Sequence, residues 1–181
     1  MKIEPEELRQ DNNIGYWLFY AQRCVAHAFT EALRSCCVKH GKPYVITPPQ
    51  WGVLALLYEQ DGLPVNMIAQ RRGLDAPTIT GIVTRLEQNG LVERKHDSKD
   101  RRSVKVHITP EGCSAIEILL PTAGDFNHAL MQGISKAEQA NILAQLQQII
   151  TNVSYVAPGA GDRFGLLPDN AQHQNNTEQK Q

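Results

Sequence analysis

The sequence predicts a mainly α-helical protein with one small β-hairpin. Apolar residues recur at three- and four-residue spacing through most of residues 8–155, which is the period of helices with one buried face. Two short helical stretches, residues 64–73 and 74–90, follow each other directly, and residues 103–109 alternate polar and apolar side chains as a half-buried strand does. Helix, turn, helix and a hairpin with a charged tip together make the plan of a winged helix-turn-helix, here with further helices at both ends.

The chain begins with two predicted helices. The first spans residues 8–40 and ends at the breaker Gly41-Lys42-Pro43. The second starts after Thr47, a predicted N-cap, with Pro48 and Pro49 in its first turn, where a missing N–H costs little. We expect its apolar residues to carry the buried side: Trp51, Val53, Leu54, Leu56 and Leu57.

The helix over residues 74–90 has two distinct faces. Asp75 is a predicted N-cap, Pro77 lies in the first turn, and Gly90 ends the helix. One face is apolar (Ile79, Ile82, Val83 and Leu86), and the other is small, polar and singly basic (Thr78, Thr80, Gly81, Thr84 and Arg85). A helix of this kind suits the major groove of double-stranded DNA.

Two more helices follow the hairpin. Thr109 and Pro110 mark the start of one, with Pro121 predicted to kink it and an apolar stripe of Ile116, Leu119, Leu120 and Ala123. Ser135 and Glu138 form a predicted capping box for the other. Its wide apolar face predicts packing against a partner subunit, together with the first helix: Ile142, Leu143, Leu146, Ile149 and Ile150.

Composition and charge narrow the class of protein. The 181 residues are 41% hydrophobic and 20% charged, with no apolar run near the ~20 residues of a membrane span and no signal peptide at the N-terminus. We therefore expect a cytoplasmic protein with no membrane partner. The net charge of −1 hides a local excess, because residues 71–105 hold nine basic and five acidic side chains. A local basic surface is sufficient for contact with phosphates.

Residues 64–110 resemble the DNA-binding core of the MarR family of transcription regulators. The resemblance rests on Ile68-Ala69-Gln70 through Gly90-Leu91-Val92, on residues 97–102 as the wing, and on Ile108-Thr109-Pro110-Glu111-Gly112. It covers roughly residues 10–155, and it departs from the family at Lys99, where an Arg is usual. It implies that Arg102 enters the minor groove, held by Asp100. The DNA-binding residues expected from the helix and the wing are Thr78, Thr80, Gly81, Thr84, Arg85, Lys99, Asp100, Arg101 and Arg102.

The resemblance also implies an organisation and a mechanism. Residues 8–46 and 110–155 would be dimerisation helices, residues 47–109 the winged helix-turn-helix, and residues 156–181, whose end is almost wholly polar, a flexible tail. The expected function is a homodimeric repressor on a pseudo-palindromic operator, released by a small aromatic or anionic ligand such as an aromatic acid. Its expected pocket is lined by Tyr16, Tyr20, Arg23 and Trp51.

Three alternatives remain open in the sequence. Some members of the family sense hydroperoxides through a Cys where this chain has Tyr16, but Cys24, Cys36, Cys37 and Cys113 leave a thiol-based redox sensor on the same fold as an alternative. No CxxC pair is present, and the Cys/His pairs on the first helix are expected to be structural, so no metal and no cofactor are predicted. A winged-helix module for protein contact and an enzyme are the other two. No catalytic motif and no catalytic residue is identified, and we expect the protein not to be an enzyme.

Overall fold

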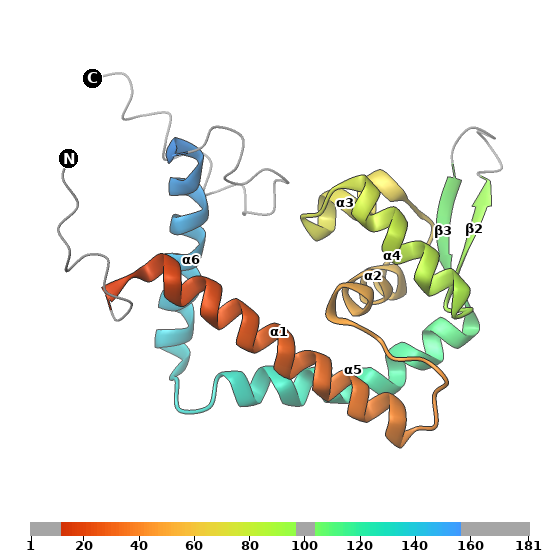
Figure 1. The fold of residues 1–181 in the computed structure, drawn as a ribbon, viewed down its shortest axis with the longest axis horizontal. Coiled ribbons are helices and arrows are strands. Elements are labelled where there is room, and N and C mark those ends of the chain that lie inside the picture. The colour runs from red at the N-terminus through yellow and green to blue at the C-terminus, as the bar shows by residue number, and fades with distance from the viewer. Residues whose placement is uncertain (1–11, 97–103, 157–181) are drawn as a thin grey trace.

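The computed structural model describes residues 12–96 and 104–156, and Figure 1 shows their arrangement. The mainly helical class with one small sheet is confirmed. In chain order, the elements are α1 (Ile14–Lys39), α2 (Pro48–Glu59), β1 (Leu63–Pro64), α3 (Val65–Arg72), α4 (Ala76–Gln88), β2 (Val92–His96), β3 (Val104–Ile108), α5 (Pro110–Leu130) and α6 (Lys136–Val156). The predicted tail lies outside the described residues, except for Val156 at the end of α6. None of the helices in the described ranges is both long enough and apolar enough to cross a bilayer.

Helix α1 begins later than the sequence indicated. The prediction placed its start at residue 8, but Asn13 is extended and its Oδ1 accepts a hydrogen bond of 2.9 Å from the N–H of Tyr16. An Asn in this position satisfies a backbone donor that has no partner within the helix, so the first turn is fixed at Ile14. The helix ends as predicted, with Gly41 in the left-handed conformation (φ +62°).

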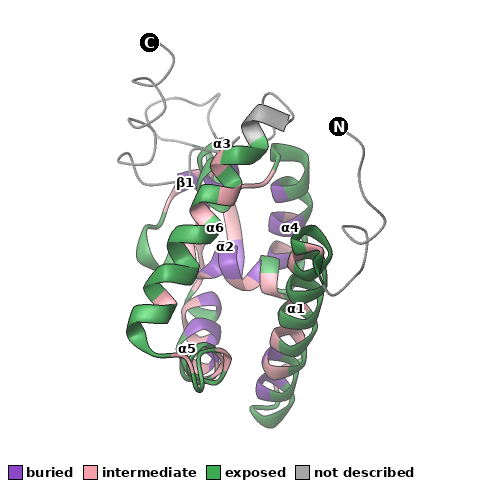
Figure 2. Ribbon diagram, turned by 90° about the vertical axis from the view of Figure 1, so that its left-hand side faces the viewer, coloured by how far each residue is buried: buried purple, intermediate pink, exposed green. Residues whose placement is uncertain are grey.

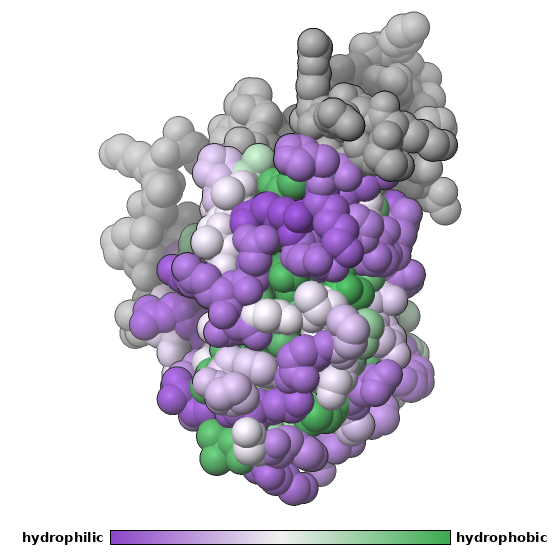
Figure 3. Space-filling model, turned by 90° about the vertical axis from the view of Figure 1, so that its right-hand side faces the viewer, coloured by the Kyte–Doolittle hydropathy of each residue, from purple (hydrophilic) through white to green (hydrophobic). Residues whose placement is uncertain are grey.

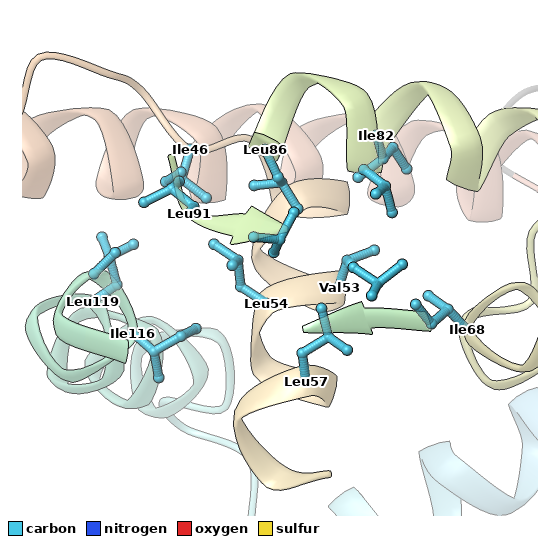
Figure 4. Close-up of a cluster of buried hydrophobic side chains, with 14 of the residues drawn as sticks. Ile46, Val53, Leu54, Leu57, Ile68, Ile82, Leu86, Leu91, Ile116 and Leu119 are labelled. Carbon is cyan, nitrogen blue, oxygen red and sulfur yellow. The ribbon is translucent and has the colours of Figure 1, made fainter. Parts of the chain in front are cut away.

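Helix α2 lies at the centre of the fold. Its start is held by the backbone N–H of Thr47, which donates to Oε1 of Gln50 at 2.9 Å. Val53, Leu54 and Leu57 are completely buried, because α1 and α5 pack on one part of α2 while α3, α4 and β3 pack on the rest. Figure 4 shows these side chains converging with those of the neighbouring elements.

The sheet has three antiparallel strands in the order β1-β3-β2. Strands β2 and β3 form the predicted hairpin, with Val92 opposite Ile108. Strand β1 was not predicted, because two residues are too few for a periodicity. It adds Leu63 beside Val106, and both side chains are buried.

Helix α5 starts against the end of α4. The Thr109 hydroxyl accepts from the N–H of Gly112 at 3.0 Å and donates to the carbonyl of Gly90 at 2.7 Å. Gly112 lies so close to Leu91 that a Cβ on it would stand 2.1 Å from the Leu91 carbonyl oxygen. The helix continues through Pro121. Leu120 was predicted in its buried stripe, which is wrong: its side chain is 53% exposed.

Helix α6 stands apart from the core. Ser135 and Glu138 form the predicted capping box, since the N–H of Ser135 donates to Oε2 of Glu138 at 2.8 Å and the N–H of Glu138 to Oγ of Ser135 at 3.3 Å. No side chain described in α6 is buried (Figure 2). A cavity of about 610 Å³ separates α6 from the start of α1, lined by Ile14, Gly15, Leu18, Phe19, Gln22, Ile149 and Val153. Large apolar side chains therefore remain exposed on both helices.

Asp61 links the end of α2 to strand β3. One carboxylate oxygen accepts from the Ile108 N–H at 2.8 Å, and the other lies 2.8 Å from Nδ1 of His107. The structure thus pairs two residues that lie 46 positions apart in the sequence. Burial raises the pKa of the Asp61 carboxyl, but hydrogen bonds from His107 and from the backbone of Ile108 and Gly62 outweigh it, so the pKa lies below its ordinary value.

We predict that Asp61→Asn lowers the free energy of unfolding by about 0.5–1 kcal/mol at pH 7, a small value because half of the side chain is exposed to solvent. The folded-state pKa is depressed, so the wild-type contribution is complete above about pH 5 and is lost as the pH falls below about 4. Urea unfolding of both proteins across this range measures it. Asp125→Asn, on the exposed side of α5, is the control. An Asp61→Asn deficit that persists unchanged at pH 3 would contradict the assignment.

Candidate nucleic-acid interface

Helix α4 is held at its start by a cap and a proline. Asp75 is extended, and its Oδ1 accepts from the N–H of Thr78 at 2.7 Å while its Oδ2 accepts from the Thr78 hydroxyl at 3.0 Å. Pro77 lies in the first turn, where its lack of an N–H leaves no hydrogen bond unmade. The preceding helix α3 ends at Gly73 (φ +62°), so α3 and α4 are joined by a short turn. The predicted helix-turn-helix geometry is present.

The inner face of α4 anchors it to the core. Ile79, Val83 and Leu86 are completely buried and Ile82 is 9% exposed, so the four predicted core positions all lie inside. Each fully buried apolar side chain contributes roughly 1.5–3 kcal/mol relative to an exposed one. The opposite face of the helix is consequently fixed in orientation by packing.

The outer face of α4 carries the predicted contact residues. Thr78, Thr80, Gly81 and Arg85 are exposed, and Thr84 is half-buried. A Cβ placed on Gly81 would meet nothing within 4 Å, so the surface is open at that point. The structure thus brings these five residues together on one side of a rigid helix.

The threonine hydroxyls on this face bond to their own helix. The Thr80 hydroxyl donates to the carbonyl of Ala76 at 2.8 Å, and the Thr84 hydroxyl donates to the carbonyl of Thr80 at 2.8 Å. A hydroxyl that donates to the preceding turn turns its proton toward the helix. Acceptor lone pairs and methyl groups, rather than hydroxyl donors, are what these side chains offer to a ligand.

Arg94, on strand β2, reaches back across α4. Its Nη1 pairs with Oε2 of Glu87, and its Nη2 donates to Oγ1 of Thr84 at 2.9 Å and to the carbonyl of Thr80 at 3.2 Å. The backbone N–H of Arg94 donates to the other Glu87 oxygen at 3.2 Å. In the sequence, Arg94 and Glu87 were recognised only as two of the charges of residues 71–105. The signal that would have found this contact is their opposite charge on either side of the turn at Gly90.

The hairpin next to α4 carries further basic residues. Lys95 and Lys105 stand opposite each other on β2 and β3, and Lys95 also pairs with Glu93 at 2.5 Å. The predicted wing residues Lys99, Asp100, Arg101 and Arg102 lie outside the described residues. Figure 3 shows the side of the molecule that bears the strands, and hydrophilic side chains cover much of the coloured surface.

The four residues predicted to bind a ligand fall into two places. The rings of Tyr16 and Tyr20 stack on the exposed side of α1, with centroids 6.0 Å apart, and Arg23 is exposed one turn further along. Trp51 instead packs edge-on against Phe29, where α2 meets α1, with centroids 6.4 Å apart. The structure thus brings together Tyr16 and Tyr20, while the ring partner of Trp51 is Phe29.

The cysteines are distributed over α1 and α5. Cys24 is exposed, Cys36 and Cys37 are buried, and Cys113 is intermediate. Burial raises the pKa of the Cys37 thiol, which lowers its thiolate fraction and its reactivity. Sγ of Cys36 lies 3.7 Å from Nδ1 of His40, but within the described ranges no group of three or more His, Cys, Asp or Glu side chains is placed to hold a metal ion.

Known proteins resemble this chain first in the helix-turn-helix and the helix before it. The model of the family described as "MarR family" matches residues 46–104. The HTH-type transcriptional regulator TtmR of Methylorubrum extorquens is 40% identical over 95 residues, which are 52% of this chain and 47% of that protein. The chain thus matches about half the length of this relative.

Solved structures extend the likeness to the flanking helices. A probable transcriptional regulator from Pseudomonas aeruginosa is 30% identical, with a TM-score of 0.68 over 78% of this chain and 99% of the other. The transcriptional repressor CouR, solved bound to a 23-mer DNA duplex, is 25% identical, with a TM-score of 0.68 over 82% of this chain and 99% of the other. The similarity therefore covers the helices on both sides of the helix-turn-helix.

Proposed function

Since the chain belongs to the MarR family of transcription regulators, we propose that it is a homodimeric repressor that binds a pseudo-palindromic DNA operator and is released by a small aromatic acid. Its family consists of transcription regulators and not enzymes. The observation that carries the proposal is the outer face of α4, which is exposed, polar and held in place by a fully buried inner face. A helix with these two faces, next to a basic hairpin, fits a major groove.

The base-reading chemistry of α4 follows from its threonines. Because the Thr80 and Thr84 hydroxyls donate to their own helix, the bases can meet the two methyl groups and the oxygen lone pairs of Thr80, while one lone pair of Thr84 already accepts from Arg94. Thymine offers a C5-methyl group in the major groove, and adenine offers an N6 amine that donates to an acceptor. We propose that Thr80, with Thr78 and Thr84, recognises A·T pairs, while Arg85 contacts a guanine or a phosphate. The wing residues Lys99, Asp100, Arg101 and Arg102 stay part of this proposal, with Arg102 in the minor groove.

The proposed recognition of A·T pairs is tested in two steps. The first selects the preferred DNA sequence, and the second removes a methyl group from the protein or from the base. Selection from a randomised duplex library should recover a palindromic sequence with A·T pairs in each half-site. Replacing the same thymine of both half-sites by uracil, or Thr80→Ser in both subunits, should each weaken binding about fourfold per half-site, the value of one buried methyl group, and the two changes together should weaken it no further. Thr30→Ser is the matched control, because the Thr30 hydroxyl bonds to the carbonyl of Ala26 at 2.7 Å in α1.

The two steps of this experiment test different parts of the proposal. If the library yields no preferred sequence at low salt, the chain does not act as a sequence-specific regulator. If a sequence is selected but no thymine responds to both changes, the function holds and the role given to the Thr80 methyl group is wrong.

The dimer is proposed to form through α1 and α6. The start of α1 and the length of α6 expose large apolar side chains, among them Phe19 at 76%, Leu143 at 58% and Ile142 at 43%. An exposed apolar surface of this extent is typical of a protein–protein interface. The predicted division into dimerisation helices (8–46 and 110–155) and a winged helix-turn-helix (47–109) is part of this proposal.

We predict that Leu146→Lys separates the subunits, since an unpaired charge in an apolar interface is costly to desolvate. Light scattering during gel filtration should give twice 20.2 kDa for the wild type and 20.2 kDa, or aggregates, for the variant. Met67→Lys is the control, because Met67 is an exposed apolar residue of α3, outside the proposed dimerisation helices. A wild-type monomer at micromolar concentration would refute the interface.

The effector is proposed to bind between the ring pair of α1 and the start of α2. The stacked rings of Tyr16 and Tyr20 offer an aromatic surface, Arg23 offers a cation for a carboxylate, and Trp51 lies where α1 meets the DNA-binding region. A ligand between these groups would favour one angle of the winged region relative to the dimer helices. It releases DNA only by as much as it prefers that angle, with about 1.4 kcal/mol for each tenfold change.

We predict that a salicylate-like acid weakens operator binding, and that the operator weakens the acid by the same factor. Calorimetric titration with and without operator measures both. Arg23→Gln should lose the effect, whereas Arg34→Gln, which removes another exposed arginine of α1, should keep it. Equal binding of every such acid in both samples would rule out this class of effector.

A further inference from the structure

We propose that Arg94 is a positioning residue that clamps strand β2 to helix α4, the proposed base-reading helix, and that it makes no contact with DNA phosphates. The inference rests on the proposed function. It gives the Arg94–Glu87 pair a role in sequence recognition that the count of basic residues in this region does not suggest, because that count treats Arg94 as one of the charges facing DNA.

The contacts of Arg94 span two turns of α4. Nη2 donates to the carbonyl of Thr80 and to Oγ1 of Thr84, and Nη1 pairs with the carboxylate of Glu87. These three residues stand at positions i, i+4 and i+7, so they follow one side of the helix. The planar guanidinium group satisfies all three acceptors at once, which the ammonium group of a lysine cannot do in the same geometry.

Burial and charge distinguish Arg94 from its neighbour. The Arg94 side chain is 26% exposed, whereas that of Lys95, the next residue, is 56% exposed. The charge of Arg94 is neutralised by Glu87, whose backbone-facing oxygen also accepts the N–H of Arg94. A guanidinium engaged in this way offers little to a phosphate, so the attraction for DNA depends on the other basic residues.

The consequence for recognition is geometric. The turn between α4 and β2 contains Gly90, with φ +70°, and only Asn89, Gly90 and Leu91 separate the two elements. Arg94 closes this turn with side-chain bonds, which fixes the direction in which β2 leaves α4. The same bonds hold the Thr84 side chain, which donates to the Thr80 carbonyl and accepts from Arg94. Arg94 thus sets both the direction of β2 and the rotamer of Thr84, a proposed base contact.

Glu87→Gln gives opposite results for the two possible roles of Arg94. If Arg94 bound a phosphate, loss of the Glu87 charge would release the cation and strengthen DNA binding. If Arg94 is a clamp, Glu87→Gln loosens it and weakens binding to the selected operator about tenfold, as expected for one charge-assisted hydrogen bond. Arg94→Lys keeps the charge but not the fork, and should weaken operator binding by about the same factor.

Non-specific DNA provides the second measurement. Binding to a random duplex depends on net charge, so Arg94→Lys should leave it within about twofold, and the ratio of specific to non-specific affinity should fall. The matched control pair is Arg34→Lys and Glu31→Gln, an exposed ion pair of 3.4 Å on α1, which should leave the ratio unchanged. Each protein is checked by thermal unfolding, so that affinities are compared among folded proteins.

Amide hydrogen exchange tests the clamp without DNA. Glu87→Gln should speed exchange in β2 and in the last turns of α4, and the control pair should not. If the wild type selects no operator but this exchange increases, the clamp exists and the proposed function is wrong. If operator binding is specific and Glu87→Gln strengthens it, or if Arg94→Lys leaves it unchanged, Arg94 is not a positioning residue. Unchanged exchange in Glu87→Gln would also refute the clamp.

Discussion

The burial of α2 is the constraint on which the rest of the structure depends. Val53, Leu54 and Leu57 on this one helix are completely enclosed, and side chains from α1, α3, α4, α5 and β3 enclose them. A core of this kind leaves each surrounding element one orientation in which its own apolar face is inside. Burial of Ile79, Val83 and Leu86 fixes the rotation of α4 about its axis, so its polar positions face outward.

A second connection joins the helix-turn-helix to the long helix that follows it. The Thr109 hydroxyl takes part in bonds to Gly90 and Gly112, and the N–H of Thr109 donates to the carbonyl of Leu91 at 3.1 Å. Gly112 is needed here because any side chain would collide with Leu91. The end of α4, the exit from the hairpin and the start of α5 are consequently one rigid joint, next to the bonds of Arg94 on the other side of the turn.

The sequence predicted the parts of the fold that are coded locally. Asp75, Thr47, Thr109 and the Ser135–Glu138 pair all cap the helices that their types and positions indicated, because capping involves residues three apart. Leu120 was misplaced because periodicity cannot tell which apolar residues at the border of a stripe face the core. The bonds of Arg94 and of His107 were missed for another reason: they join residues 7 and 46 apart, so only the packed structure brings them together. The helical period alone was sufficient to predict which five residues share the outer face of α4.

The continuity of α5 has a mechanical consequence. The helix runs from the joint at Thr109 to the arm formed with α6 and the start of α1 (Figure 1). Its 21 residues span roughly 30 Å at about 1.5 Å per residue. Over such a length, a tilt of about 5° at one end of a rigid helix displaces the other end by roughly 2.5 Å. In a dimer held through that arm, each subunit contributes one such helix, so a small change of angle at Pro121 becomes a larger change in the separation of the two α4 helices. The grooves of DNA repeat about every 34–36 Å, so the two α4 helices can enter successive major grooves only when their separation matches this distance.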